Sequence, residues 1–160
     1  MDQITMKMDP VKGESQLDTF EEEIEILSYS HGVSMQVTGD VSNTERTSGR
    51  PNVQDFTLTK YADLATNPLN QSCCEGKIFP SALITISRND GGKSIKLMTY
   101  TLENVVISSI SIGGGGGDKP VETLSLNFAK IEWNYIAQLE AGGAAGNIPG
   151  TWDIALNKAA

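Results

Sequence analysis

The chain has one histidine, His31, and a hydrolytic triad would depend on it as the general base. Ser30 and Ser34 lie close to it in the sequence. Neighbouring residues of an extended strand point to opposite faces, so this spacing does not bring a nucleophile to the imidazole. The sequence therefore predicts that His31 is a surface or wall residue and not a catalytic base.

The residues that could bind a metal ion or a phosphate also lack the spacing that such sites need. Cys73, Cys74 and one histidine lack the paired spacing of a tetrahedral zinc site. The acidic residues 21–23 lack the order of an EF-hand, so we interpret them as a solvated acidic edge. The glycine run at 113–117 lacks the order of a P-loop and is not followed by a helix. Paired carboxylates of the glycosidase type remain open, because distant acids can meet in space. We predict no cofactor, no metal and no enzymatic activity.

Composition excludes several classes of partner. The 160 residues contain 12 Lys and Arg against 20 Asp and Glu, a net charge of −8, which argues against binding nucleic acid or an anionic membrane. No apolar stretch approaches the ~20 residues of a membrane span, and residues 1–10 do not form a secretory signal. The two cysteines are adjacent and would bridge only through a strained ring, so we expect free thiols and folding in the cytosol.

The hydrophobic pattern predicts a mainly β domain, either a small barrel or a two-sheet sandwich, with one short helix. The helix is expected within residues 61–76, with Thr66 or Asn67 as its cap, Pro68 at its first position and Gly76 as its terminator. Strands are expected at 4–8, 24–30, 33–37, 53–60, 82–87, 95–102, 104–112 and 121–135, the last with a bulge near 129–130.

Two segments do not follow this pattern. Residues 39–52 contain one aliphatic side chain, Val41, and form a long excursion of the kind that is functional or mobile. We expect one domain over residues 1–160 with a loosely packed tail at 140–160, in which a flexible spacer precedes a short segment that packs Trp152. No repeat of 20–50 residues is visible.

Six segments along the chain carry a more specific signal. They are residues 11–15, residues 24–30 with Gly32, residues 55–61 with Asp63, residues 106–111, residues 122–130, and Trp152-Asp153 with Asn157-Lys158. Each is a weak motif alone, but the six in register over nearly the whole chain resemble the Hcp family (haemolysin-coregulated protein), the inner-tube subunit of the bacterial type VI secretion system. His31 stands where some members have Trp, which would alter the polarity of the wall.

This resemblance implies a fold and a mode of assembly. The family fold is a small two-sheet β-barrel with a helix on one side, related to phage tail tube proteins. Six copies form a ring, rings stack into a tube, and a contractile sheath with a tip, or spike, drives the tube out. Members hold effector proteins in the lumen. They are made in the bacterial cytoplasm and exported by the apparatus to the medium or a target cell, without a signal peptide or membrane insertion.

The resemblance also gives expected roles to residues. Ser28 and Ser30 alternate with Leu27 and Tyr29, so we expect the serines to face solvent and the larger side chains to pack inward. We predict Ser28, Ser30 and His31 as lumen residues that face cargo. Within the 39–52 loop, Glu45, Arg46 and Arg50 are the predicted ring-stacking residues.

Two other classes are kept as alternatives. The first is a monomeric β-sandwich module that binds carbohydrate or protein through a platform of Trp133, Trp152 and Tyr135, although packing is the favoured role of these rings. The second is an enzyme, since some relatives carry a fused toxin domain. The chain ends about 25 residues after its last long predicted strand, too few to build a second core, so we expect no catalytic domain.

Overall fold

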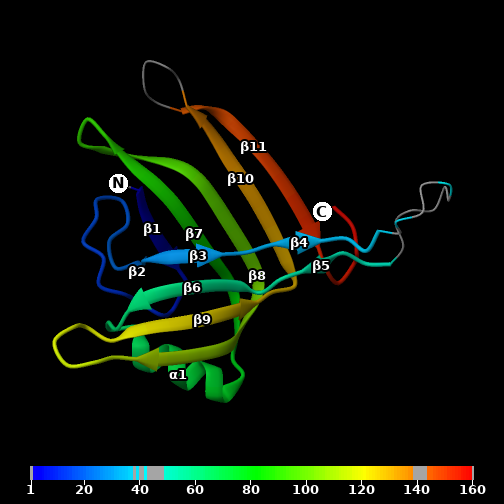
Figure 1. Cartoon of the computed structure of the whole chain (residues 1–160). Helices are drawn as coiled ribbons and strands as arrows, with labels where there is room; N and C mark the ends of the chain where they lie inside the picture. The colour runs from blue at the N-terminus through cyan, green and yellow to red at the C-terminus, as the bar shows by residue number, and fades with distance from the viewer. Residues whose placement is uncertain (1, 38, 40–41, 43–48, 139–143, 160) are drawn as a thin grey trace.

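The computed structural model of the chain describes residues 2–37, 39, 42, 49–138 and 144–159 (Figure 1). It confirms a mainly β protein with one short helix. The elements in order are β1 (Asp2–Lys7), β2 (Ile24–Ile26), β3 (Ser28–Ser30), β4 (Val33–Ser34), β5 (Asn52–Val53), β6 (Phe56–Tyr61), α1 (Thr66–Glu75), β7 (Ile78–Asp90), β8 (Lys93–Gly113), β9 (Val121–Asn127), β10 (Lys130–Gln138) and β11 (Ala144–Asp153).

The strands wrap around one core. Antiparallel pairing follows the path β2-β1-β7-β8-β9-β6-β3, with β10 and β11 added beside β8. The two ends of this path, β2 and β3, are separated in the chain only by Leu27, whose N–H donates to the Thr59 carbonyl at 2.7 Å. The path therefore starts and ends in one extended segment, which agrees with the small barrel that the resemblance implied.

The long strand β8 joins the two halves of the sheet. Its partner β10 pairs with residues 98–103 and its partner β9 with residues 106–113. We predicted two strands here with a break at Glu103, but the strand is continuous, and the neighbouring Asn104, with a φ of 52°, does not interrupt it. The single strand predicted at 121–135 is instead two, β9 and β10, so the change of apolar face there reflects a strand break and not a bulge.

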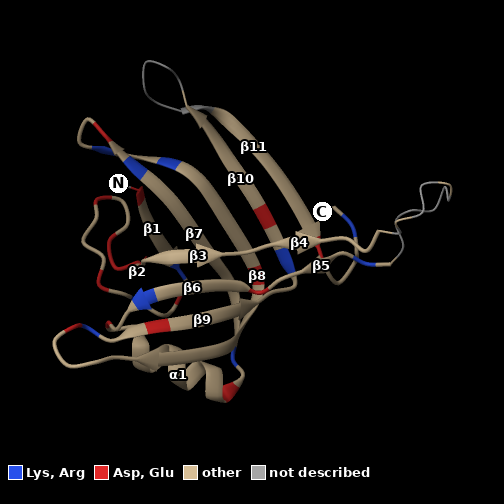
Figure 2. Cartoon of the chain, viewed as in Figure 1, with Lys and Arg blue, Asp and Glu red and all other residues tan. Residues whose placement is uncertain are grey.

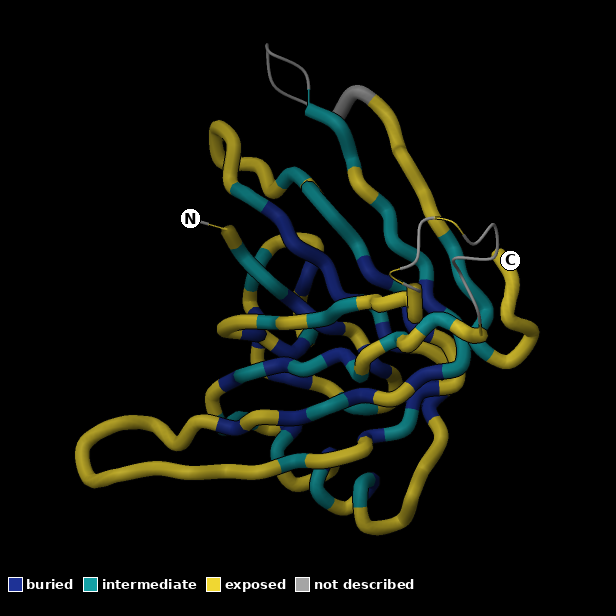
Figure 3. Tube along the Cα trace, turned by 45° about the vertical axis from the view of Figure 1, so that its right-hand side comes forward, coloured by how far each residue is buried: buried dark blue, intermediate teal, exposed yellow. Residues whose placement is uncertain are grey.

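Alternate residues of the strands point inward and form the core, as the hydrophobic pattern predicted. Phe56 and Leu58 of β6 are fully buried, and Phe128, between β9 and β10, is 4% exposed. Their neighbours in the cluster come from every long strand and from Leu69 of α1. Figure 3 shows buried residues alternating with exposed ones along the strands, the signature of a sheet with one covered face.

Helix α1 lies within the predicted range and ends as predicted at Gly76, whose φ of 65° is the left-handed conformation that glycine adopts without steric cost. Its start differs from the prediction. Ala65 occupies the cap position without a side-chain hydrogen bond, and Pro68 is the third helical residue. Thr66 does not cap the helix because its hydroxyl accepts from the Asp63 N–H and donates to Glu122.

A buried ion cluster ties the helix to the sheet. Lys60 and Glu122 are paired across β6 and β9, and both are fully buried. The Lys60 ammonium bonds to the carboxylates of Glu122 and Asp63 and to the Tyr61 carbonyl. The Asp63 carboxylate also accepts from the Ala65 N–H at 2.9 Å. These charge-assisted bonds fix the residues from which α1 begins.

The C-terminal segment is more regular than expected. Residues 144–153 form β11, which pairs with β10 along its whole length, so the predicted flexible spacer is wrong for this stretch. Residues 140–143 lie outside the described residues. Trp152 packs against the core, as predicted.

Candidate functional site

The outer face of β3, β6, β9 and the end of β8 is lined with hydroxyl side chains. Strand register aligns them in two rows that cross the four strands. The first row is Ser28, Thr59, Thr123 and Ser111, and the second is Ser30, Thr57, Ser125 and Ser109. We call these eight residues the hydroxyl face. Inward-facing Phe56, Leu58, Leu124 and Leu126 alternate with them, so core packing fixes their direction.

The hydroxyl face has different neighbours at its two ends. Leu27, Tyr61 and Val121 are exposed at one end, and Tyr61 pairs with Val121. At the other end the Asp55 carboxylate accepts hydrogen bonds from Ser108 at 2.8 Å and Asn127 at 2.9 Å. Figure 2 shows no charged residue on β3, whereas acidic residues gather on the loop that links β1 to β2. The face is thus polar and carries little charge.

Ser28 and Ser30 are exposed, and Tyr29 between them is half-buried with its ring stacked on Phe56 at 5.8 Å. The predicted directions of these three side chains, with the serines toward solvent and the tyrosine inward, are confirmed. The prediction that Leu27 packs inward is wrong, because its side chain is 46% exposed. Leu27 and Ser28 both point outward where β2 passes into β3. At this point the inward-facing side chains change from even-numbered to odd-numbered residues.

His31 lies apart from the serines. Its ring packs into an aromatic cluster, 5.5 Å from the Phe56 ring, 5.9 Å from Phe128 and 6.2 Å from Trp133, between centroids. Its Nδ1 bonds to the Gln54 carbonyl at 3.1 Å. Burial lowers the pKa of His31. The imidazole thus lies against the core, on the opposite side of the chain from the Ser30 side chain. Since His31 and Tyr29 are two residues apart in an extended segment, the alternation of side chains would have indicated this position.

No catalytic constellation surrounds this histidine in the described part of the chain. The Nε2 atom is buried and has no hydrogen-bond partner there, so no described hydroxyl or thiol is activated by it. Cys73 is half-buried, Cys74 is exposed, and both are free thiols. Groups of three or more potential metal ligands are also absent among the described residues.

The described residues 33–37 and 49–53, which we call the arm, contain the short strands β4 and β5 at one side of the molecule (Figure 1). Strands β4 and β5 pair Val33 with Val53 and Ser34 with Asn52. Of the predicted stacking residues, Arg50 is exposed, and Glu45 and Arg46 lie outside the described residues. A cavity of about 310 Å³ separates the arm from β10 and β11, and it is lined by Val33, Ser34, Met35, Pro51, Trp133 and Trp152. We call it the arm groove.

Exposed large apolar side chains are spread over the described residues, and Leu64, Ile78, Ile112 and Leu156 stand apart from the two groups that follow. In one group, Val33 and Met35 line the arm groove, and Tyr135 pairs with Ile148 across β10 and β11, the strands that bound the groove through Trp133 and Trp152. The other comprises Leu27, Tyr61 and Val121 at the end of the hydroxyl face. In Figure 1, β4 and β5 lie on one side of the molecule, and the loop from β8 to β9, which leads into Val121, lies on the other. Tyr135 shares the face of Ile131 and Trp133, and the sequence analysis had named it with Trp133 and Trp152 in the alternative aromatic platform.

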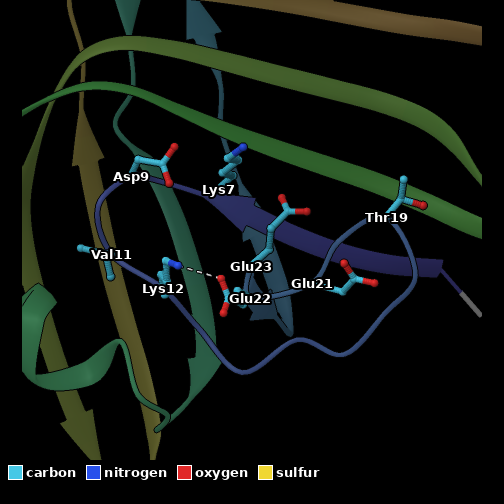
Figure 4. Close-up of a pocket in the computed structure, with 8 residues that line it drawn as sticks. All are labelled: Lys7, Asp9, Val11, Lys12, Thr19, Glu21, Glu22 and Glu23. Carbon is cyan, nitrogen blue, oxygen red and sulfur yellow. Dashed lines mark hydrogen bonds and ion pairs between the residues drawn. The ribbon is translucent and has the colours of Figure 1, made fainter.

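A second cavity of about 290 Å³, beside the loop from β1 to β2, is lined mainly by charged side chains (Figure 4). Lys12 and Glu22 form an ion pair of 2.8 Å at its rim, and both are well exposed. Burial raises the pKa of the Glu23 carboxyl. Four carboxylates and two lysines thus line this cavity, and within the acidic run Glu21 and Glu22 are exposed while Glu23 is half-buried.

These features define a class: a small antiparallel β protein with one hydroxyl-lined face and exposed apolar side chains. The comparisons with known proteins make this class specific. Residues 5–135 match the family model for the type VI secretion system effector Hcp. The chain is 37% identical over 155 residues to Protein hcp1 of Pseudomonas aeruginosa, covering 95% of this chain and 94% of that protein. The chain therefore belongs to the Hcp family of type VI secretion proteins.

Solved structures agree with this assignment. One described as a type six secretion system protein superposes with a TM-score of 0.94 at 28% identity and covers all of both chains. Hcp1 from Salmonella typhimurium has a TM-score of 0.81 at 24% identity over 99% of each chain, which supports the fold. No helix in the described part of the chain combines the length and the hydropathy that a bilayer crossing needs.

Proposed function

We propose that the whole chain, residues 1–160, is one inner-tube subunit of the type VI secretion apparatus. Six copies form a ring, rings stack into a tube, and effector proteins travel in the lumen. The tube contacts the sheath and the tip proteins, and it moves with its cargo from the cytoplasm to the outside. The polypeptide works by assembly and has no catalytic activity.

The observation that carries this proposal is the presence of two apolar groups on different sides of the chain. A ring requires that one surface of a subunit meet a different surface of the next. Val33, Met35, Tyr135 and Ile148 supply apolar area around the arm groove, and Leu27, Tyr61 and Val121 supply it elsewhere. Contiguous exposed apolar area of this kind marks association sites in soluble proteins.

The hydroxyl face fits the wall of a lumen. Serine and threonine hydroxyls can donate and accept hydrogen bonds, but they carry no charge that would hold a passing protein tightly. Ser28 and Ser30 are central to this proposed wall, and the chemistry of the face would let cargo bind reversibly.

Two substitutions that introduce the same charge test the proposal. Ile148→Asp places a carboxylate in the apolar group at the arm groove and should prevent ring formation. Ser30→Asp places it on the hydroxyl face and should leave rings intact while weakening the retention of co-expressed effectors. Light scattering measures the mass of each species, and co-purification measures cargo.

The wild-type chain should have several times its 17.2 kDa monomer mass, and negative-stain images should show a central hole. A monomer at micromolar concentration would overturn the proposal. Loss of rings in Ser30→Asp would show that the hydroxyl face is an interface between subunits and not the lumen wall.

A further inference from the structure

The chain folds back on itself at the end of β11 in a short closed turn. The Asp153 N–H donates to the Lys158 carbonyl at 2.8 Å, and the Lys158 N–H donates to the Asp153 carbonyl at 3.3 Å. Within this loop the Asp153 carboxylate accepts from the Leu156 N–H at 2.9 Å. We call residues 153–158 the C-terminal turn. Its backbone is thus held by its own hydrogen bonds.

The C-terminal turn holds Leu156 in solvent at a fixed place. The Leu156 side chain is 61% exposed, whereas Ile154 of the same turn packs against the core and donates its N–H to the Ala129 carbonyl at 2.9 Å. A single exposed leucine is ordinary on a protein surface. This one is attached to a turn that is already ordered, so little conformational entropy is lost when the side chain meets a partner.

A cavity of about 420 Å³ at the start of β1 has the shape and chemistry to receive such a side chain. We call it the N-terminal pocket. Ile4 and Ile26, which are paired across β1 and β2, line it together with Leu17 and Leu27. The remaining lining residues are Asp2, Gln3 and Glu25. The pocket therefore combines an aliphatic surface with two carboxylates.

The charges of the pocket and of the turn are complementary. Asp2 and Glu25 are exposed, and so is Lys158, two residues after Leu156. Among the described residues, none of these three side chains forms an ion pair. An apolar centre with opposite charges at its rim is the usual composition of a specific protein interface, in which the charges fix orientation.

The two surfaces lie on opposite sides of the molecule. In Figures 1 and 3 the N-terminal end of β1 is on one side and the C-terminal end of the chain is on the other. Surfaces placed in this way meet between two copies of the chain in the same orientation, which is a heterologous contact. Leu27 belongs both to the N-terminal pocket and to the exposed group with Tyr61 and Val121. The pocket is therefore continuous with a surface that the proposed function assigns to assembly.

We propose that the C-terminal turn of one copy docks in the N-terminal pocket of the next, with Leu156 against the aliphatic side chains and Lys158 beside Asp2 and Glu25. Each copy contributes one turn and one pocket, so the contact is head-to-tail. The inference rests on the proposed function for self-association, and it names the residues that make one of the contacts.

A mixing experiment tests this contact. Leu156→Asp disables the turn but leaves the pocket intact, and Leu17→Asp disables the pocket but leaves the turn intact, because each buries a carboxylate in an apolar contact. Light scattering from micromolar to millimolar concentration measures the mass of each species. The mass of the wild type should rise with concentration above that of either variant. An equimolar mixture of the two purified variants should reach about twice the mass of either alone, because one intact turn meets one intact pocket and the chain of contacts then stops.

Leu64→Asp is the matched control. Leu64 is 67% exposed and lies in neither surface, so the same substitution there should leave the mass of the assembly unchanged. Thermal denaturation checks that each variant is folded. If Leu17→Asp fails to fold, Glu25→Lys takes its place in the mixture, since this side chain is exposed and its reversal repels Lys158.

Two outcomes would overturn the contact: a wild type with the same mass as Leu156→Asp over the whole concentration range, or a mixture that keeps the mass of the separate variants. The failure of the proposed function is distinct from both. A wild type that stays monomeric throughout contradicts ring formation itself, whereas wild-type rings that Leu156→Asp does not affect contradict only the docking of the turn.

Discussion

At the scale of single residues, the segment 28–31 places hydroxyl side chains on one face of the sheet and aromatic side chains on the other. Ser28 and Ser30 point outward to the hydroxyl face, while Tyr29 and His31 point inward to the aromatic cluster. This follows from the two-residue period of an extended chain, since side chains alternate between the faces of the sheet. A shift of one residue in register would exchange the two sets, so the packing of Tyr29 and His31 maintains the uncharged outer surface.

Phe128 provides a test of this packing at one residue. It is almost fully buried, and its ring contacts the His31 ring at 5.9 Å between centroids. Replacing it with alanine leaves a cavity, so Phe128→Ala should lower the free energy of unfolding by roughly 3–5 kcal/mol. Urea denaturation measures this value. Thr123→Ala, on the exposed hydroxyl face, is the control and should change stability by about 0.5 kcal/mol or less. A loss below about 1 kcal/mol for Phe128→Ala would place this ring outside the core.

At the scale of elements, the buried ion cluster explains how one short helix is positioned. Lys60→Met leaves the carboxylates of Glu122 and Asp63 buried without their cation, and we expect a loss of about 3–5 kcal/mol in unfolding free energy. The double variant Lys60→Met with Glu122→Met removes the pair together and should recover much of this loss. Chemical denaturation of the wild type and of both variants measures these unfolding free energies. A double variant as unstable as Lys60→Met would show that packing, and not the unpaired charge, causes the loss.

The sequence predicted the elements that have a clear period and missed those that do not. Alternation in β6 correctly identified Phe56 and Leu58 as core, and Gly76 correctly marked the end of α1. Strand β11 was missed because it contains glycines and Pro149, which have a low preference for strands. An edge strand tolerates proline because one side of it needs no ladder hydrogen bond.

The candidate site could be predicted only in part for a related reason. Ser28 and Ser30 were found from local alternation, and their exposure is confirmed. Their partners in the two rows, such as Thr59 and Thr123, depend on strand register between distant segments, which the local pattern does not specify. The arm groove was missed for the same reason, since Met35 and Trp152 meet only in the folded chain.

At the scale of the whole molecule, charge and apolar area are separated. The net charge of −8 belongs largely to loops and edges, the hydroxyl face is almost uncharged, and the apolar groups lie on different sides. A net charge well away from zero favours solubility, while unlike apolar surfaces favour head-to-tail contacts that close into a ring. This division supports a subunit that associates in a defined geometry without aggregating.

The last prediction concerns residues 42–49, which join the two strands of the arm in the chain and which the proposed function assigns to ring stacking. Deleting residues 42–49 shortens the arm but leaves β4, β5 and the arm groove, so rings should still close while stacked filaments become shorter. Electron micrographs give filament length, and light scattering gives ring mass. Replacing the same residues with glycine and serine at equal length separates the two causes: restored filaments would mean that reach matters, and short filaments would mean that side chains such as Glu45 and Arg46 matter. Filaments of wild-type length in the deletion variant would show that the arm has no part in stacking.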